Sequence, residues 1–297
     1  MGKNVLDFII IGAQKAGTTS FFRYLDAHPQ IYMPPEKEAT YFSRDERFYR
    51  GWEWYLREFF GDAPADKLWG KVTPDYMADP RVPQRIKSTL PDVKLIALLR
   101  NPIERAYSQY RMSVRRGYEP RSFEGAIHEL LKPDALEEAR NRPTPTNSYI
   151  VRGEYGRILA KYYELFPSQQ IVVFFTEELK HNPREVMKTT FQFLGVNSDF
   201  VPPDLGDVYH KGGTRRRLPW VDSLMRANHV RTICRRMISG KYRRRVRYWL
   251  DQWNVVPDEG SKQIQPAVRQ LLVRHYEEDI RQLSALTGRK HPWVVWD

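Results

Sequence analysis

The stretch FIIIGAQKAGTTSFFRYL, residues 8–25, decides the fold. It begins with a short apolar run at 8–11, which has the length and composition of a buried β-strand. The chain then turns through 12–17, between two glycines, and a helix is expected to begin at Thr18. A strand, a glycine turn and a helix N-terminus in this order are typical of a phosphate-binding loop, because successive backbone N–H groups and the helix dipole attract an anion.

The loop departs from the pattern of nucleoside triphosphatases in the place of its lysine. That pattern has Gly, four residues, and then Gly-Lys-Ser/Thr. Gly12 and Gly17 have the required spacing, but Thr18 occupies the lysine position and Lys15 lies inside the turn. This lysine can add a positive charge to the anion that the loop holds. The predicted anion-binding residues of the loop are Lys15, Ala16, Gly17, Thr18, Thr19 and Ser20.

Apolar runs and helical patterns alternate along the chain up to residue 195. Strands are expected at 7–11, 69–72, 93–99 and 170–175. Helices are expected at 18–27, 52–59, 80–89, 102–116, 122–139, 150–166 and 183–194, with a last helix near 263–287. This alternation predicts an α/β fold of the P-loop type, a parallel sheet flanked by helices, as a single domain over 1–297. No further clear strand is expected after residue 195.

The net charge of +12 comes from one region of the chain. Residues 211–250 hold thirteen Lys or Arg residues and one acidic residue, Asp222, whereas the remaining residues carry 35 basic and 35 acidic side chains. Such a region, expected to form basic helices, can meet an anionic substrate, polymer or membrane surface, or can be a solvated helix face. We do not expect nucleic acid to be a partner.

Cysteine usage and hydropathy indicate the cellular compartment of the protein. The single cysteine, Cys234, allows no internal disulfide and no cysteine-based zinc site. No stretch approaches the roughly 18–20 apolar residues of a membrane-spanning helix, and the N-terminus enters a strand too early for a cleaved signal peptide. These features predict a cytoplasmic protein.

A second candidate phosphate site follows the run VKLIALLRNP at 93–102. Phosphate loops that handle triphosphates hold Mg²⁺ with a Ser/Thr and an Asp at the end of another strand. Here the strand ends in Arg100 instead, and a cation in that place suits a bound phosphate and opposes a metal. Ser108 is expected about two turns into the following helix. The sequence therefore predicts a ligand with two anionic groups and no metal ion.

These residues resemble the sulfotransferases that use 3′-phosphoadenylyl sulfate (PAPS). QKAGTTS at 14–20 looks like their 5′-phosphosulfate loop, and LIALLRNPIERAYSQY at 95–110 looks like their 3′-phosphate motif, with Arg100 and Ser108 at phosphate-binding positions. KEATYFS, GWEWYLREFF, the helix–strand unit at 152–179 and the closing YEEDIRQLSALTGRKHPW extend the likeness over nearly the whole chain, toward heparan-sulfate-type and bacterial members. The resemblance implies a P-loop fold, PAPS as co-substrate, 3′,5′-ADP (PAP) as product, and Lys15 as a catalytic cation beside the oxygen that bridges phosphorus and sulfur.

The resemblance also implies a general base. In the heparan-sulfate-type enzymes this base is a glutamate followed three residues later by an aromatic pair, and EATYF places Glu38 there, before Tyr41 and Phe42. Glu36 is the nearby alternative. A purely structural interpretation of Glu38 is a salt bridge with Lys37 or another surface charge.

Histidine and lysine positions separate this chain from branches of that family. The cytosolic branch uses a histidine base, and neither His28 nor His128 is a convincing match. The heparan-sulfate-type pattern Glu-Lys-Thr-Pro-x-Tyr reads GKVTPDY at 70–76, so Val72 stands at the family lysine position and Lys71 at the glutamate position. Because alternate strand residues point to opposite faces, Lys71 is not a simple replacement. The second catalytic cation is left open.

A late glycine loop is the last candidate. HKGGTRRR at 210–217 resembles the Lys-Gly loop that folds over the nucleotide in several branches of the family. Its candidate nucleotide-binding residues are Lys211, Gly212, Gly213, Thr214 and Arg215. The alternative is a plain loop that leads into the basic helices.

Together these features predict an enzyme that moves a sulfuryl group from PAPS to a hydroxyl or an amine. The acceptor is open, since a glycan, a lipid, a polyketide or a small molecule all fit and the fold says little about it. Two other classes of protein remain as alternatives. One is a P-loop kinase or nucleoside triphosphatase, which would want a lysine at position 18 and an acidic strand end. The other is a non-catalytic protein that binds anionic surfaces through 211–250.

Overall fold

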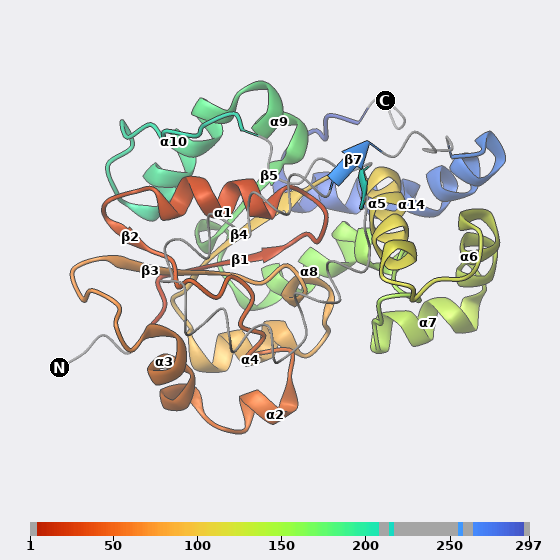
Figure 1. Ribbon diagram of the computed structural model, residues 1–297. Helices are drawn as coiled ribbons and strands as arrows, with labels where there is room; N and C mark the ends of the chain where they lie inside the picture. Colours follow the sequence, from red (N-terminus) through yellow and green to blue (C-terminus); the bar gives the residue numbers. More distant parts are fainter. Residues whose placement is uncertain (1–4, 208–213, 217–254, 258–263, 294–297) are drawn as a thin grey trace. The chain divides into compact units, whose positions relative to one another are not determined.

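A computed structural model describes residues 5–207, 214–216, 255–257 and 264–293 (Figure 1). The chain divides into two compact units, one formed by Met1–Tyr209 with Ile264–Asp297 and the other by His210–Gln263. The expectation of a single domain over 1–297 stays a prediction. The basic region 211–250 lies almost wholly outside the described residues, and its helices stay a prediction.

The first unit is built on a five-stranded parallel sheet. Its strands are β1 (Phe8–Gly12), β2 (Ile31–Tyr32), β3 (Leu68–Val72), β4 (Lys94–Leu99) and β5 (Ile171–Phe175), and their order across the sheet is β2-β3-β1-β4-β5. The central strand β1 pairs in parallel with β3 on one side and with β4 on the other. The predicted α/β fold with a parallel sheet is confirmed, and the carboxyl ends of all five strands share one edge.

The apolar runs form strands because the sheet is covered on both faces. Every residue of β1 is buried, and so are all residues of β4 after Lys94. Helices α1 (Thr18–Asp26) and α10 (Pro183–Leu194) lie on one side of the sheet, and α4 (Val82–Thr89) and α8 (Tyr155–Leu165) on the other (Figure 1). Continuous burial of this kind favours uninterrupted branched and apolar side chains over a polar alternation.

The remaining helices expected from the sequence are present with two refinements, and the short elements at 45–48, 76–78, 168–170 and 176–181 were not expected. They are α2 (Asp45–Phe48), α3 (Trp52–Phe60), η1 (Tyr76–Ala78), α5 (Pro102–Arg115), α6 (Phe123–Leu130), α7 (Pro133–Asn141), η2 (Val151–Gly153), η3 (Ser168–Gln170), α9 (Thr176–His181) and α14 (Pro266–Thr287). The single helix expected at 122–139 is two helices, because Pro133 begins a new helix at its N1 position. The helix expected at 150–166 begins with the short 3₁₀ turn η2.

The expectation of no strand after residue 195 is wrong. The short strands β6 (Thr214–Arg216) and β7 (Val255–Pro257) pair in antiparallel fashion within the second unit. Each has three residues, which is too short for a hydrophobic period to identify it. The strand β2 was not expected for the same reason, since it has only two residues.

The last helix, α14, packs mainly on α8 and has five buried side chains. These are Val268, Leu272, Tyr276, Ile280 and Leu283. Asp279 of this helix accepts hydrogen bonds from the backbone N–H groups of Gly156 (3.0 Å) and Arg157 (2.9 Å), and so caps the first turn of α8. Burial raises the pKa of Asp279 to about 6, although these two hydrogen bonds act in the opposite direction. Among the described residues, no helix is both long and apolar enough to cross a membrane.

Candidate functional site

The loop between β1 and α1 has the backbone of an anion cradle. Gly17, the N-cap of α1, has φ 93°, and Lys15 has φ 74°, so both lie in the left-handed region. Such a conformation is common for glycine and uncommon for lysine, which marks residue 15 as constrained by its surroundings. The N–H of Ala13 donates to the carbonyl of Leu98 (2.7 Å), which ties the start of the loop to β4. The first backbone N–H groups of an α-helix have no acceptor within the helix, and together with the helix dipole they attract an anion.

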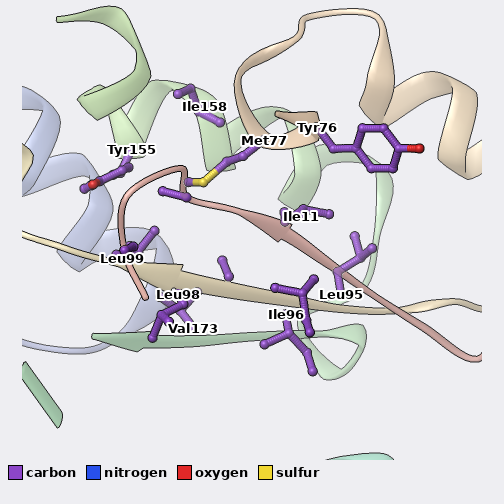
Figure 2. Close-up of a cluster of buried hydrophobic side chains, with 14 of the residues drawn as sticks. Ile11, Tyr76, Met77, Leu95, Ile96, Leu98, Leu99, Tyr155, Ile158 and Val173 are labelled. Carbon is purple, nitrogen blue, oxygen red and sulfur yellow. The ribbon is translucent and has the colours of Figure 1, made fainter. Parts of the chain in front are cut away.

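Buried side chains pack against the point where β1 ends and the loop to α1 begins. Figure 2 shows Met77 beside the end of β1, with Ile11 of that strand and Tyr155 and Ile158 of α8 around it. A Cβ atom at Gly12 would lie 2.6 Å from the Cβ of Met77, so only glycine allows the strand to pass this close. The turn therefore starts from a fixed point in the core.

The carboxyl ends of β4 and β5 hold the other side of the loop. The Thr176 hydroxyl, at the start of α9, lies 2.8 Å from the carbonyl oxygens of both Ala16 and Leu99. Arg100, directly after β4, donates from Nη1 to the carbonyl of Lys15 (3.3 Å). The Tyr155 hydroxyl donates to the carbonyl of Arg100 (2.8 Å). The structure thus brings Arg100 beside the loop between β1 and α1. Its role in binding a phosphate stays a prediction.

Helix α5 begins directly after this arginine. The Asn101 side chain caps the helix by accepting from the N–H groups of Ile103 (3.0 Å) and Glu104 (3.3 Å). Ser108 lies two turns along the helix and is half-buried. The cap fixes where the helix starts, and so fixes the placement of Ser108 relative to Arg100.

Lys15 carries an electrostatic signature of an anion site. Burial, as the largest cause, and the positive charges of Arg115, Arg100, Arg116 and Lys37 together lower the pKa of its ammonium group to about 8. Cations that gather around a buried lysine repel one another in the free protein, and a bound anion relieves that repulsion. Arg115 and Arg116, at the end of α5, were not singled out from the sequence. Their position relative to the loop depends on the fold.

The segment that carries the candidate base is fixed by Tyr76. The hydroxyl of this residue accepts from the N–H groups of Tyr41 (2.8 Å) and Phe42 (3.2 Å) and donates to the carbonyl of Ala39 (3.1 Å). Tyr41 and Phe42 are buried, and their rings pack on Trp52. The aromatic pair therefore anchors the segment in the core. Tyr55 and Phe60 of α3 are buried in the same core, whereas Tyr49 is 79% exposed.

Lys37 joins the segment that carries Glu38 to the first turn of α1. Its Nζ lies 2.8 Å from the Thr19 hydroxyl oxygen and 3.4 Å from Oε1 of Glu38. The Glu38 side chain is 51% exposed. The salt bridge with Lys37 that a structural interpretation of Glu38 expects is therefore present, and it lies beside the first turn of α1. Residue Glu36, the alternative base, is also exposed.

Lys71 is a second residue whose environment the sequence did not indicate. It lies in β3 with 1% of its surface exposed, and its Nζ donates to the backbone carbonyl of Glu36. Its ammonium group is 5.3 Å from the ring centre of Phe59. Burial lowers the pKa of Lys71 to about 7, partly offset by the negative charge of Glu36. Val72, at the family lysine position, is completely buried.

Histidine has a structural role next to α1. His28 is 1% exposed, its Nε2 lies 3.0 Å from the carbonyl oxygen of Asn197, and its Nδ1 accepts from the N–H of Gln30 (3.2 Å). Both ring nitrogens are thus engaged. Within the described ranges, no group of three or more His, Cys, Asp or Glu residues is placed to hold a metal ion.

The late glycine loop falls largely outside the described residues. Lys211, Gly212 and Gly213 lie outside them, and Thr214 and Arg215 belong to β6 in the second unit. Their assignment to the nucleotide stays a prediction.

The loop, the strand-end arginine and the surrounding cations define an α/β protein with a cluster of positive charges at the carboxyl edge of a parallel sheet. The family model described as "Sulfotransferase domain" matches residues 6–211. The chain therefore belongs to the sulfotransferase family, and this membership supports an enzyme that transfers a sulfuryl group.

Similar proteins agree with this assignment. The chain is 41% identical over 139 residues to the membrane-associated sulfotransferase kil1 of Dictyostelium discoideum, covering 44% of this chain and 29% of that protein. It is 30% identical over 201 residues to the human bifunctional heparan sulfate N-deacetylase/N-sulfotransferase 2, covering 64% of this chain and 22% of that protein. It thus spans less than a third of the length of these relatives. A crystal structure of a sulfotransferase from Alicyclobacillus acidocaldarius has a TM-score of 0.68 at 27% identity, covering 97% of each chain.

Proposed function

We propose that this protein transfers a sulfuryl group from PAPS to a hydroxyl or an amine and releases 3′,5′-ADP. The observation that carries the proposal is the placement of Arg100 beside Lys15, with a hydrogen bond of 3.3 Å to the loop backbone. A cation at the end of β4, next to a phosphate loop, suits a ligand with one phosphate at the loop and another at the strand end. PAPS has this arrangement of a 5′-phosphosulfate and a 3′-phosphate.

The phosphosulfate is assigned to the loop amides, Lys15 and the hydroxyl of Thr19. The 3′-phosphate is assigned to Arg100 and Ser108, because arginine forms strong paired hydrogen bonds with phosphate oxygens. A cation at the strand end takes the place at which triphosphate enzymes hold Mg²⁺ through a carboxylate. The proposed donor site therefore uses protein cations for charge neutralisation.

Glu38 is assigned as the general base. It removes a proton from the acceptor, whose oxygen or nitrogen forms a bond to sulfur as the bond from sulfur to the bridging oxygen breaks. The electron pair of that bond stays on the departing phosphate, whose growing charge is stabilised by Lys15 and the loop amides. The half-exposed Glu38 lies beside the first turn of α1 through Lys37, where an acceptor can approach from solvent.

The acceptor class is tested by turnover. The full chain is incubated with PAPS and a panel comprising a glucosaminyl glycan, a phenol, a hydroxylated lipid and a polyketide alcohol, and each product is analysed by mass spectrometry. The proposal expects one class to gain the mass of a sulfuryl group with matching release of 3′,5′-ADP. Release of inorganic phosphate from ATP, with no sulfuryl transfer to any acceptor, would contradict it.

The base is tested by Glu38→Gln, which keeps the size of the side chain and removes its basicity. We expect normal binding of adenosine 3′,5′-bisphosphate and a loss of turnover of about 10²-fold or more, since a general base contributes roughly 10²–10⁴. Glu36→Gln is the matched control, and it should retain most of the activity. Near-complete transfer by Glu38→Gln, together with a large loss in Glu36→Gln, would assign the base to Glu36.

A further inference from the structure

Lys37 occupies a position that a stability role does not explain. Its Nζ contacts the Thr19 hydroxyl at 2.8 Å and Oε1 of Glu38 at 3.4 Å, and the Glu38 side chain is half-exposed. An ion pair this exposed contributes little to folding stability. Burial lowers the pKa of Lys37, and the negative charge of Glu38 only partly offsets this effect. The ammonium group is therefore held in a place that costs it hydration.

The Thr19 hydroxyl, which Lys37 contacts, lies in the first turn of α1, directly after the glycine loop. Thr18 and Ser20, on either side, are 5% and 8% exposed, whereas Thr19 is half-buried. Thr19 therefore turns its side chain outward in the first helical turn, where loop amides gather an anion. The charge of Lys37 also acts on Lys15, whose pKa it lowers.

The strand β3 offers no second lysine to accompany Lys15. Position 72 is a buried valine, and the ammonium group of Lys71 is taken by the carbonyl of Glu36 beneath the ring of Phe59. Lys37 comes from the adjacent segment, yet it reaches the first turn of α1 across 18 residues of chain.

We propose that Lys37 is a second catalytic cation, which contacts the 5′-phosphosulfate of the donor and stabilises the leaving phosphate together with Lys15. The proposal rests on the proposed function above. The acceptor's proton goes to Glu38, the acceptor-to-sulfur bond forms, and the bond from sulfur to the bridging oxygen breaks with its electron pair on 3′,5′-ADP. Lys37 gives no proton in this step, and its charge offsets the charge that gathers on the bridging oxygen.

The first test measures binding and needs no acceptor. Adenosine 3′,5′-bisphosphate and adenosine 3′-monophosphate are titrated into wild type, Lys37→Met and Arg100→Ala. We expect Lys37→Met to bind the bisphosphate at least about tenfold more weakly, as loss of a charged hydrogen bond implies, and to bind the 3′-monophosphate like wild type. Arg100→Ala should weaken both ligands. Lys87→Met, which removes the same charge from α4, is the matched control and should change neither.

Unchanged bisphosphate affinity in Lys37→Met, or equal weakening of both ligands, would overturn the proposal.

The second test separates a catalytic cation from a residue that only positions Glu38. Turnover is compared in Lys37→Met, Glu38→Gln and the double variant. A positioning residue loses its effect once the base is gone. We expect a further loss of about tenfold or more in the double variant relative to Glu38→Gln, and no further loss would overturn the proposal. If wild type transfers no sulfuryl group, the proposed function fails, and the binding test still decides the contact of Lys37.

Discussion

Raising the pH from 7 to 9 is expected to weaken the binding of adenosine 3′,5′-bisphosphate about tenfold through Lys15 alone. The pKa of this residue is lowered to about 8 by burial and by the neighbouring cations. The free protein then loses the Lys15 charge as the pH rises through 8. A bound anion favours the charged form and raises the pKa, so binding at high pH must be accompanied by proton uptake.

The size of the effect follows from the fraction of protein that carries the charge. With a pKa of about 8, roughly nine tenths of the molecules carry it at pH 7 and roughly one tenth at pH 9. The apparent dissociation constant rises by the same ratio, which corresponds to about 1.4 kcal/mol. Both phosphates of the ligand are fully ionised above pH 8, and their titration adds little to the slope in this range.

Isothermal titration calorimetry at pH 7, 8 and 9 measures this dependence. Repeating the pH 9 titration in buffers of different ionisation enthalpy gives the number of protons taken up, and we expect close to one. Lys15→Met should bind more weakly at all three pH values with a much flatter dependence, and Lys15→Arg should keep its charge throughout. If wild type and Lys15→Met lose affinity in parallel from pH 7 to 9, the assignment of the shifted pKa to Lys15 is refuted.

Two other variants probe the site and its support. Arg100→Ala should weaken bisphosphate binding by about tenfold or more, because it removes an arginine–phosphate pair, and Ser108→Ala should do so more mildly; calorimetry measures both, and two unchanged affinities would place the 3′-phosphate elsewhere. Lys71 has its pKa lowered to about 7 by burial, so between pH 7 and 10 the unfolded chain holds a proton that the folded chain does not. The free energy of unfolding of wild type, relative to that of Lys71→Met, should therefore rise from pH 7 to pH 10 by an amount on the order of 3–5 kcal/mol. Urea unfolding of both proteins at pH 7 and pH 10 measures this, and the same difference between wild type and variant at both pH values would contradict it.

The sheet could be predicted from the sequence because its strands are buried on both faces. Runs such as those of β1 and β4 need continuous apolar residues, and few other structures require them over so short a length. The strand β2 could not be recognised, since two residues carry no period and its pairing with β3 depends on the whole sheet. The break between α6 and α7 was visible in Pro133, which cannot continue a helix in its interior.

Some residues of the candidate site could likewise be placed from the sequence, and others could not. Lys15 and Arg100 follow strands that end at the same edge, so their proximity follows from a parallel sheet once the strand order is known. Lys37 was assigned only to an ion pair with its neighbour, because its contact with Thr19 depends on the path of the chain after β2. The burial of Lys71 was hidden because a lysine in a strand is usually exposed.

Ligand choice is the most direct test of the central claim, that the loop and the strand-end arginine form a site for a 3′-phosphorylated adenosine nucleotide. Thermal unfolding of the full chain is followed with adenosine 3′,5′-bisphosphate and, separately, with ATP and Mg²⁺. At 100 times its dissociation constant a ligand adds roughly 2.7 kcal/mol to the free energy of unfolding. We expect a clear upward shift of the unfolding temperature with the bisphosphate and a much smaller shift with ATP and Mg²⁺. A shift with ATP and Mg²⁺ equal to or larger than that with the bisphosphate would contradict it.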